Sequence, residues 1–323
     1  MSKPTASLSL DLDNKWSYLK THGDASWEQH PSYLDLMVPR SLEMLDELGL
    51  SITYFVVGQD AVIDSNHRAL RSIADAGHEI GNHSFHHEPW LHLYSAEQLS
   101  EELNRAQDAI ESATGKRPIG FRGPGFSLSR QTLSTLLDLG IEYDCSTLPT
   151  FIGPLARMYY FWTSRLDKEQ KEERKILFGT MKEGLRSLRP YQWQLHDQKI
   201  LEIPVTTIPI VRSPFHVSYL LFLLRFSKTL ALTYFRFALA MCRLGGVEPS
   251  LLLHPLDFLG AEDDADLAFF PAMDLGAKRK CEFLRTVLSI YRDKYNVVTM
   301  HEHASRIMQQ PRIPQLAATS LAN

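Results

Sequence analysis

The stretch Ala6-Ser7-Leu8-Ser9-Leu10-Asp11-Leu12-Asp13 begins as an apolar strand and ends in two aspartates. The same succession, an apolar run followed by polar side chains, recurs four more times. The further clusters are His83-Ser84-Phe85-His86-His87, Arg122-Gly123-Pro124-Gly125-Phe126, Tyr143-Asp144-Cys145-Ser146 and Leu252-Leu253-His254-Pro255. Together, in this order, they can build one open metal site with a base, an acid and an orienting arginine, which is the equipment for hydrolysing an amide.

Helical patterns lie between the apolar runs. The sequence predicts helices over 38–48, 66–76 and 95–114, the last opened by a capping box of Ser95 and Gln98, and another from Ser129 to Gly140. Strands are predicted over Ala6–Leu10, Ile52–Val57, His78–Gly81, Ile119–Arg122, Ile141–Tyr143, Leu201–Ile203, Ser250–Leu253 and Asn296–Met300. This alternation predicts an α/β fold whose parallel sheet closes, or nearly closes, into a barrel. In such barrels the active site lies at the carboxyl ends of the strands, where all five clusters fall.

Composition limits the classes of function. Of 323 residues, 44% are hydrophobic and 22% are charged, and the net charge is −4. No basic excess exists to neutralise phosphates, so a nucleic-acid partner is not expected. The three cysteines are few, odd in number and far apart, which predicts free thiols. No long apolar segment follows Met1–Thr5, so we expect no secretory signal and a cytoplasmic protein, with peripheral contact at the inner membrane face as the one addition.

Two stretches interrupt the alternation of strands and helices. Residues 151–195 hold an aromatic-rich part followed by a charged run, and residues 213–246 form a long apolar segment. We interpret both as insertions into a single barrel domain of residues 1–312, which is followed by a tail over 313–323.

The second insertion has an unusual charge pattern. Arg212–Val247 contains no acidic residue. On one continuous helix, Arg225, Arg236 and Arg243 would project at nearly the same angle, with Lys228 close to it and leucines and aromatics over much of the rest. This pattern predicts an interfacial helix on an anionic membrane. An ordinary core helix whose basic residues face water remains the alternative.

The first two clusters hold the side chains suited to a metal. Asp11 and Asp13 stand two apart on a strand and therefore share a face. His83 and His87 have the four-residue spacing that lets two imidazoles meet one metal, and a carboxylate would complete an open site. The alternatives are a solvated strand end and a surface loop rich in histidine.

The other clusters offer groups that would support a reaction. Arg122 beside the aspartates could hold one carboxylate in a fixed orientation. His254 follows a buried apolar run and could act as a general acid if a partner such as Asp144 holds its protonated form. A surface arginine and a structural histidine are the plainer interpretations.

As a set, the clusters resemble the motifs of the polysaccharide deacetylase family, the NodB-homology carbohydrate esterases, from Leu8 to about Ala304 outside the insertions. The resemblance implies a distorted (β/α) barrel of about seven strands. Its implied roles are Asp11 as catalytic base, Asp13, His83 and His87 as metal ligands, Arg122 as the residue that orients Asp11, His254 as catalytic acid tuned by Asp144, and Phe126, Leu252 and Trp90 as substrate contacts. The implied metal is Zn²⁺, with Ni²⁺, Co²⁺, Fe²⁺ and Mn²⁺ as alternatives.

This sequence departs from the family pattern at two places. Leu12 separates two aspartates that are adjacent in many members. Cys145-Ser146-Thr147 follows Asp144, where members acting on polysaccharides often carry a tryptophan. The second departure weakens the case for a polymeric substrate.

The resulting prediction is a deacetylase of carbohydrate metabolism that hydrolyses the amide of an N-acetylated or N-formylated sugar. If residues 213–246 lie on a membrane, that sugar would be linked to a polyprenyl phosphate. One alternative is a cyclic-amide or ureide hydrolase on the same barrel. Another is a non-catalytic membrane-surface binding protein, although nothing structural requires six such polar groups at strand ends.

Overall fold

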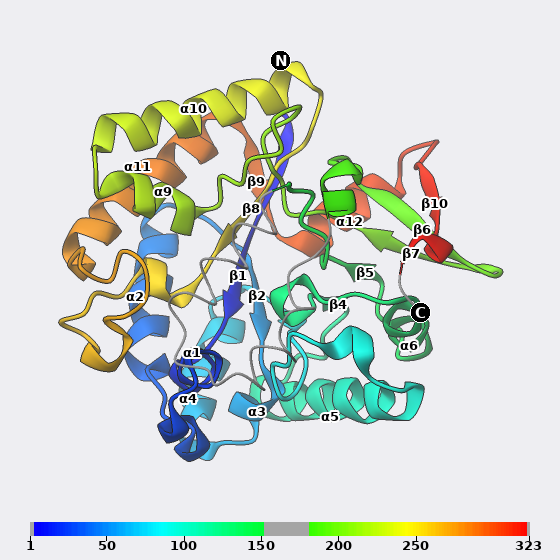
Figure 1. Cartoon of the computed structure of the whole chain (residues 1–323), viewed down its shortest axis with the longest axis horizontal. Coiled ribbons are helices and arrows are strands. Elements are labelled where there is room, and N and C mark those ends of the chain that lie inside the picture. Colours follow the sequence, from blue (N-terminus) through cyan, green and yellow to red (C-terminus); the bar gives the residue numbers. More distant parts are fainter. Residues whose placement is uncertain (1–2, 152–180, 322–323) are drawn as a thin grey trace.

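The computed structural model describes residues 3–151 and 181–321. Within them, seven parallel strands form the barrel wall in the order β8-β1-β2-β3-β4-β5-β7. Their bounds are β1 Thr5–Leu12, β2 Thr53–Val56, β3 Glu79–Asn82, β4 Gly120–Phe121, β5 Tyr143–Asp144, β7 Gln198–Glu202 and β8 Ser250–Leu253. Figure 1 shows β1 running through the middle of the molecule with helices on the outside. The predicted α/β barrel is confirmed.

Three strands lie beside this wall. The strand β6 (Tyr191–Leu195) pairs antiparallel with β7, and β10 (Gln315–Ala317) pairs parallel with β6. The strand β9 (Asn296–Val298) pairs with the beginning of β1. Thus the last residues of the expected insertion over 151–195 extend the sheet as β6, and residues 152–180 of that insertion lie outside the described residues.

The gap between the two ends of the wall is bridged by the chain after β7. Thr206 donates its backbone N–H to the carbonyl oxygen of Ser250 at 3.1 Å, and the N–H of Ser250 donates to Thr206 Oγ1 at 2.8 Å. These two bonds replace a regular strand ladder, so the barrel is distorted rather than evenly closed.

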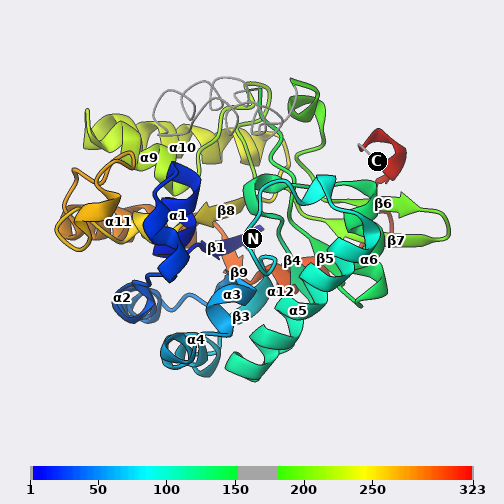
Figure 2. The same cartoon turned by 60° about the horizontal axis from the view of Figure 1, so that its bottom comes forward.

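Helices cover the outside of the barrel. They are α1 Lys15–His22, α2 Leu34–Glu47, α3 Gly58–Ala61, α4 Asp64–Asp75, α5 Ala96–Thr114, α6 Arg130–Asp138, α9 Val217–Leu224, α10 Lys228–Leu244, α11 Ala277–Lys294 and α12 Met300–Met308. Figure 2 shows α3, α4 and α5 along one side and α9, α10 and α11 along another. The capping box predicted at Ser95 is present, with its side chain accepting the N–H of Gln98.

The alternation of side chains along β1 separates the core from the site. Leu8 and Leu10 are fully buried in the large core that β1 shares with the surrounding helices. Ser9 and Asp11 point to the opposite face, because successive side chains of a strand alternate. Phe55 of β2 belongs to a separate small cluster of buried apolar side chains, inside the wall. The polar face of β1 is therefore directed into the barrel.

The second insertion forms two helices instead of one. The helix α9 ends at Leu224, and α10 begins after Ser227, whose side chain accepts the N–H of Leu230 at 3.3 Å. The prediction of one continuous helix, on which Arg225 would align with Arg236 and Arg243, was therefore wrong. Arg225 lies outside α10 and pairs with Asp274 at 3.1 Å. Among the described helices, none has the length and apolar character needed to cross a bilayer.

Candidate active site

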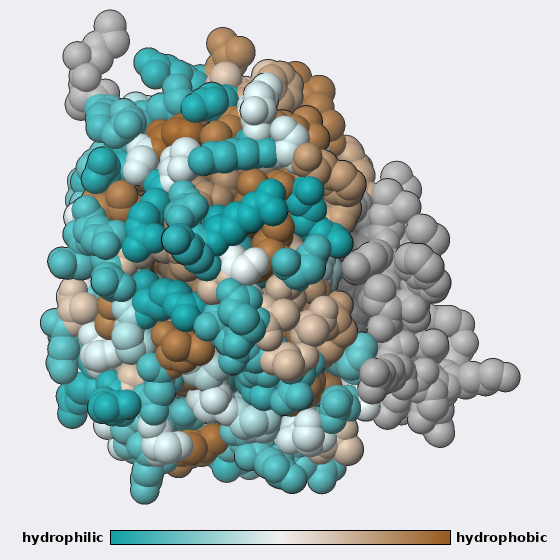
Figure 3. All heavy atoms as spheres, turned by 90° about the vertical axis from the view of Figure 1, so that its left-hand side faces the viewer, coloured by the Kyte–Doolittle hydropathy of each residue, from teal (hydrophilic) through white to brown (hydrophobic). Residues whose placement is uncertain are grey.

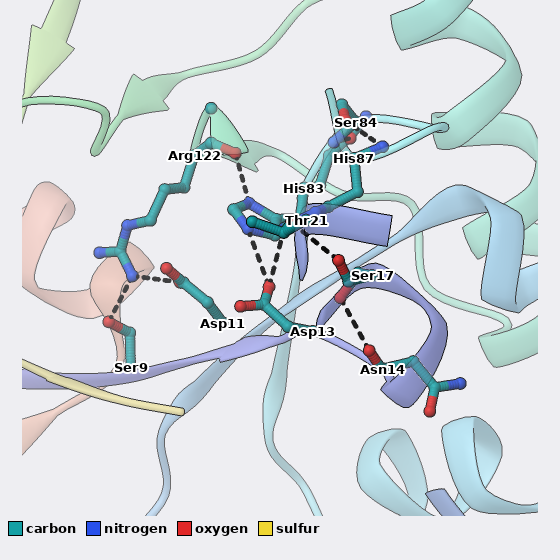
Figure 4. Close-up of polar contacts among 12 residues, drawn as sticks. Ser9, Asp11, Asp13, Asn14, Ser17, Thr21, His83, Ser84, His87 and Arg122 are labelled. Atoms are coloured by element: carbon teal, nitrogen blue, oxygen red, sulfur yellow. Dashed lines mark hydrogen bonds and ion pairs between the residues drawn. The ribbon is translucent and has the colours of Figure 1, made fainter. Parts of the chain in front are cut away.

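Three side chains from two segments converge at the carboxyl end of the barrel. Asp13 Oδ1 lies 3.4 Å from His83 Nε2 and 2.9 Å from His87 Nε2. One ligand atom from each residue lies within 4.8 Å of the others, the one such cluster found in the described residues. Figure 4 shows the three side chains directed toward one another. Two imidazoles and one carboxylate are a donor set that suits a divalent transition metal and leaves positions open.

The ring of His83 is held in the orientation that a metal ligand needs. Its Nδ1 lies 2.6 Å from the backbone carbonyl oxygen of Arg122. A carbonyl only accepts, so Nδ1 carries a proton and Nε2 faces Asp13 with its lone pair free in the neutral ring. The backbone at Arg122 thus orients the ring of His83.

The loop that carries His87 has an unusual backbone. Ser84 and His87 both have positive φ, 62° and 53°. Such conformations are costly for residues other than glycine and tend to occur at functional sites. Buried Glu102 of α5 fixes the loop, because it accepts the backbone N–H groups of Phe85 and His86 at 2.9 and 2.6 Å.

His86 lies outside the metal cluster. Its Nδ1 is 2.6 Å from Glu102 Oε2. Burial acts to raise the pKa of the Glu102 carboxyl, but the bonds from His86 outweigh it and hold that pKa below its usual value. His86 therefore helps to fix the loop.

Asp11 and Arg122 form a buried ion pair beside the cluster. Arg122 Nη1 lies 2.6 Å from Asp11 Oδ1, and its guanidinium also donates to Ser9 Oγ at 2.9 Å and to the carbonyl oxygen of Cys145 at 3.1 Å. The same guanidinium lies 4.3 Å from the ring centroid of Phe55. These contacts fix the Asp11 carboxylate next to the metal cluster (Figure 4).

Neighbouring charges shift the pKa values of Asp13 and His83. Burial raises the pKa of the Asp13 carboxyl, but His87 and His83 outweigh burial and hold that pKa well below its usual value. Burial lowers the pKa of His83, while Asp11 and Asp13 outweigh it, so that pKa is raised. A divalent cation can take the place of protons in such a cluster, because it supplies the same positive charge.

His254 emerges from the end of β8 with partners other than the predicted one. Its Nδ1 lies 3.2 Å from Ser218 Oγ, and its backbone N–H donates to Asp257 Oδ2 at 2.8 Å. Ser218 Oγ in turn donates to Asp257 Oδ1 at 2.9 Å. The predicted pairing of His254 with Asp144 is therefore wrong.

Asp144 belongs to a different buried group. It accepts a bond from Ser146 Oγ at 2.5 Å and stands opposite Glu202 in the pairing of β5 with β7. Burial raises the pKa of both carboxyls, and the charge of Asp144 adds to the rise at Glu202. Ser146 Oγ also accepts the N–H of Gly123, so this group fixes the loop after Arg122.

The predicted substrate contacts lie around the same end of the barrel. Leu252 is fully buried and stands beside Ser9 in the register of β8 with β1, on the inner face. Phe126 has a positive φ of 61° and is half-buried. Trp90 is half-buried in a neighbouring loop, where the N–H of His92 donates to Ser127 Oγ at 3.0 Å. The loops of Phe126 and Trp90 are thereby joined.

Several residues of the site were not singled out from the sequence. Ser9 lies two residues before Asp11, and period-two alternation could have placed it on the same face. Asp257 lies three residues after His254, a spacing that could have marked it as a local partner. Ser218 gave no such signal, because it lies far from the other clusters in the sequence and meets His254 only in the folded chain.

Residues 26–143 match the protein family described as "Polysaccharide deacetylase". The matched stretch includes His83, His87 and Arg122. Asp11 and Asp13 precede it, and His254 follows it. The match therefore covers only the middle part of the site, and the structure brings Asp11, Asp13 and His254 to the same end of the barrel.

The chain is also similar to individual proteins, in sequence or in fold. The chain is 31% identical over 163 residues to a peptidoglycan deacetylase of Helicobacter pylori, which covers 50% of this chain and 54% of that protein, so the alignment spans about half of the relative. A structure from Mycobacterium smegmatis, assigned as a polysaccharide deacetylase, superposes with a TM-score of 0.65 at 22% identity, covering 98% of this chain and 93% of the other. The PuuE allantoinase gives a TM-score of 0.56 at 14% identity, covering 96% and 92%. Both structures support the distorted barrel.

Proposed function

We propose that this chain is a member of the polysaccharide deacetylase family and, on that premise, a metal-dependent deacetylase that hydrolyses the amide of an N-acetylated sugar. The observation that carries the proposal is the proximity of two groups. The cluster of Asp13, His83 and His87 lies directly beside the ion pair of Asp11 and Arg122. Metal-assisted amide hydrolysis uses both an open metal site and a fixed base next to it.

The residues have distinct roles in this proposal. Asp13, His83 and His87 would hold a divalent ion, with Zn²⁺ as our first choice. When bound, such an ion supplies a Lewis acid and lowers the pKa of water toward neutrality. Asp11, oriented by Arg122, takes a proton from the attacking water.

His254 completes the reaction as the general acid. The water oxygen adds to the carbonyl carbon, the C–N bond breaks, and His254 gives a proton to the leaving nitrogen. The products are acetate and a free amino sugar. Leu252, Phe126 and Trp90 would form the apolar wall that contacts the acetyl group and the sugar ring.

Acetate release is the direct test of this function. Purified protein is incubated with N-acetylated chitin oligosaccharides and with peptidoglycan fragments, beside allantoin as a cyclic ureide. We expect release from a sugar, loss of release in Asp11→Asn, and no turnover of allantoin. Turnover of allantoin alone would show that the barrel serves ureide hydrolysis instead.

We further propose that α9 and α10 place the enzyme on an anionic membrane, where the sugar is carried on a polyprenyl phosphate. Leu230, Phe237 and Leu244 recur every seven residues along α10 and are all exposed, Leu244 by 83%. Phe226, in the turn before α10, is 70% exposed. Figure 3 shows apolar side chains gathered along the upper edge of this side of the molecule.

Basic side chains lie on the same helix as these exposed apolar residues. Lys228, Arg236 and Arg243 of α10 are exposed, and Arg212–Val247 contains no acidic residue. A helix with exposed apolar and basic side chains suits the interface of an anionic bilayer. At that surface, an enzyme of the cytoplasm would meet a sugar attached to lipid.

Vesicle co-sedimentation tests the membrane proposal. The wild type should sediment with vesicles containing phosphatidylglycerol and stay in solution with pure phosphatidylcholine. Arg236→Glu/Arg243→Glu should abolish sedimentation. Lys116→Glu/Lys199→Glu makes the same charge change at two exposed positions elsewhere and should have no effect. Equal sedimentation of both double variants would rule the surface out.

A further inference from the structure

His254 is held by two residues that lie outside the motifs, Ser218 at its ring and Asp257 at its backbone. Ser218 of α9 approaches Nδ1 at 3.2 Å, and its hydroxyl donates to Asp257 Oδ1 at 2.9 Å. The second carboxylate oxygen accepts the backbone N–H of His254 at 2.8 Å. The three residues therefore form a closed ring of hydrogen bonds.

The direction of these bonds fixes the tautomer of the ring. A carboxylate only accepts, so the single hydroxyl proton of Ser218 is used on Asp257. The oxygen of Ser218 is then left to accept a proton from His254 Nδ1. Consequently Nε2 is the nitrogen that gains and loses the proton, as a general acid requires.

Lys280 of α11 fixes the loop that carries Asp257. Asp257 is 1% exposed and Lys280 is fully buried. Lys280 Nζ donates to the carbonyl oxygens of Leu256 at 2.9 Å and of Leu259 at 2.7 Å. Burial lowers the pKa of Lys280 to about 8, with Asp257 opposing, and burial raises the pKa of Asp257, with His254 opposing.

Asp257 is the carboxylate that contacts His254, and two other titratable residues of the site do not take its place. The His216 ring centroid lies 5.8 Å from that of His254, and burial with the charges of His254 and Arg122 lowers the pKa of His216 to about 3. His216 is therefore neutral at physiological pH. Asp144 is bonded to Ser146. Asp257 is thus the carboxylate that reaches His254.

We infer that Ser218 and Asp257 are positioning residues for the catalytic acid, forming an Asp257–Ser218–His254 relay in which α9 of the second insertion completes the site. The inference rests on the proposed function for its effect on catalysis. The relay keeps the proton of the neutral ring on Nδ1 and directs Nε2 toward the leaving group. The acid is thereby ready to protonate the leaving amine.

The relay makes a kinetic prediction. Ser218→Ala and Asp257→Asn should each lower kcat by about tenfold or more, part of the full effect of a general acid, with KM little changed. Ser218→Thr keeps a hydroxyl and should restore most of kcat. A kcat that falls in Asp144→Asn but in neither Ser218→Ala nor Asp257→Asn would overturn the relay.

A second readout is independent of turnover. In ¹⁵N-labelled protein, the resonances of His254, assigned by their loss in His254→Gln, should report the Nδ1–H tautomer, and this preference should disappear in Ser218→Ala and persist in Ser218→Thr. An unchanged tautomer in Ser218→Ala would contradict the relay even in an active enzyme. The expected change without any deacetylation would support the relay and count against the proposed function.

Discussion

Arg122 and Asp11 are joined by an ion pair of 2.6 Å in which Arg122 is fully buried and Asp11 is 5% exposed. The guanidinium reaches Ser9 and the carbonyl oxygen of Cys145 as well, so one side chain links β1, β4 and β5. A buried charge with a single partner depends on that partner for its stability. The pair is therefore both a part of the site and a structural contact.

Replacing Arg122 tests this dual role. Arg122→Met should lower the free energy of unfolding by about 3–5 kcal/mol, because Asp11 is left buried without a partner. Arg122→Met/Asp11→Leu removes both charges and should recover much of the loss. Urea unfolding measures both variants. Equal stability of the wild type and Arg122→Met would show that Asp11 does not depend on Arg122 for its charge.

The two aspartates of the first cluster should respond differently to the same substitution. Asp13→Asn should lose bound metal and activity together, because it removes a charged ligand. Asp11→Asn should keep the metal and its bond to Arg122 but lose activity, since an amide cannot take up the proton of water. Metal analysis beside acetate release distinguishes the two. Loss of metal in Asp11→Asn alone would show that the roles are exchanged.

Glu102 should affect metal affinity without touching the metal. Glu102→Gln weakens the bonds that fix the loop between His83 and His87, so metal affinity should fall about tenfold or more. Glu101→Gln changes the exposed neighbour on the same helix and serves as the matched control. Competition with a chelator of known affinity gives both constants. Equal affinities would show that the loop holds its shape without Glu102.

Asp60 should make stability depend on pH. Burial raises the pKa of its carboxyl to about 7, although bonds from Asn14 and Trp16 oppose the rise. The folded state therefore holds a proton that the unfolded state releases near its ordinary pKa, so this contribution is present at low pH and lost as pH rises through about 7. The loss is at most about 4 kcal/mol at roughly 1.4 kcal/mol per pKa unit.

Asp60→Asn should lack this dependence, because the amide keeps an acceptor for Asn14 and Trp16 without titrating. The difference in unfolding free energy between the variant and the wild type should thus shift in favour of the variant between about pH 5 and pH 8. Urea unfolding at both pH values measures it. Parallel curves for the two proteins would refute the raised pKa.

The strands that position the site could be predicted closely from sequence. Residues Ser250–Leu253 form β8 as expected, and Ala6–Leu10 lies within β1, because a short apolar run before a polar cluster is a clear signal. The strands β6 and β10 were missed. They lie at the edge of the sheet, in a part of the chain read as an insertion and in the expected tail.

The partners of site residues were harder to predict. Asp13, His83 and His87 meet as the sequence indicated, since each follows a strand end. The partner predicted for His254, Asp144, was wrong, because the contact of His254 with Ser218 and Asp257 depends on how the chain turns after β8 and where α9 packs. The break before α10 was likewise not predicted, although Ser227 caps the new helix by accepting the N–H of Leu230.

Metal content joined to acetate release tests the central claim most directly. Purified wild type should hold about one equivalent of a divalent metal, and His83→Ala/His87→Ala should hold none. Acetate release from an N-acetylated sugar should stop with a chelator and return when Zn²⁺ is added. A wild type that binds no metal after incubation with Zn²⁺, or that releases acetate equally well in the double variant, would contradict a metal-dependent deacetylase.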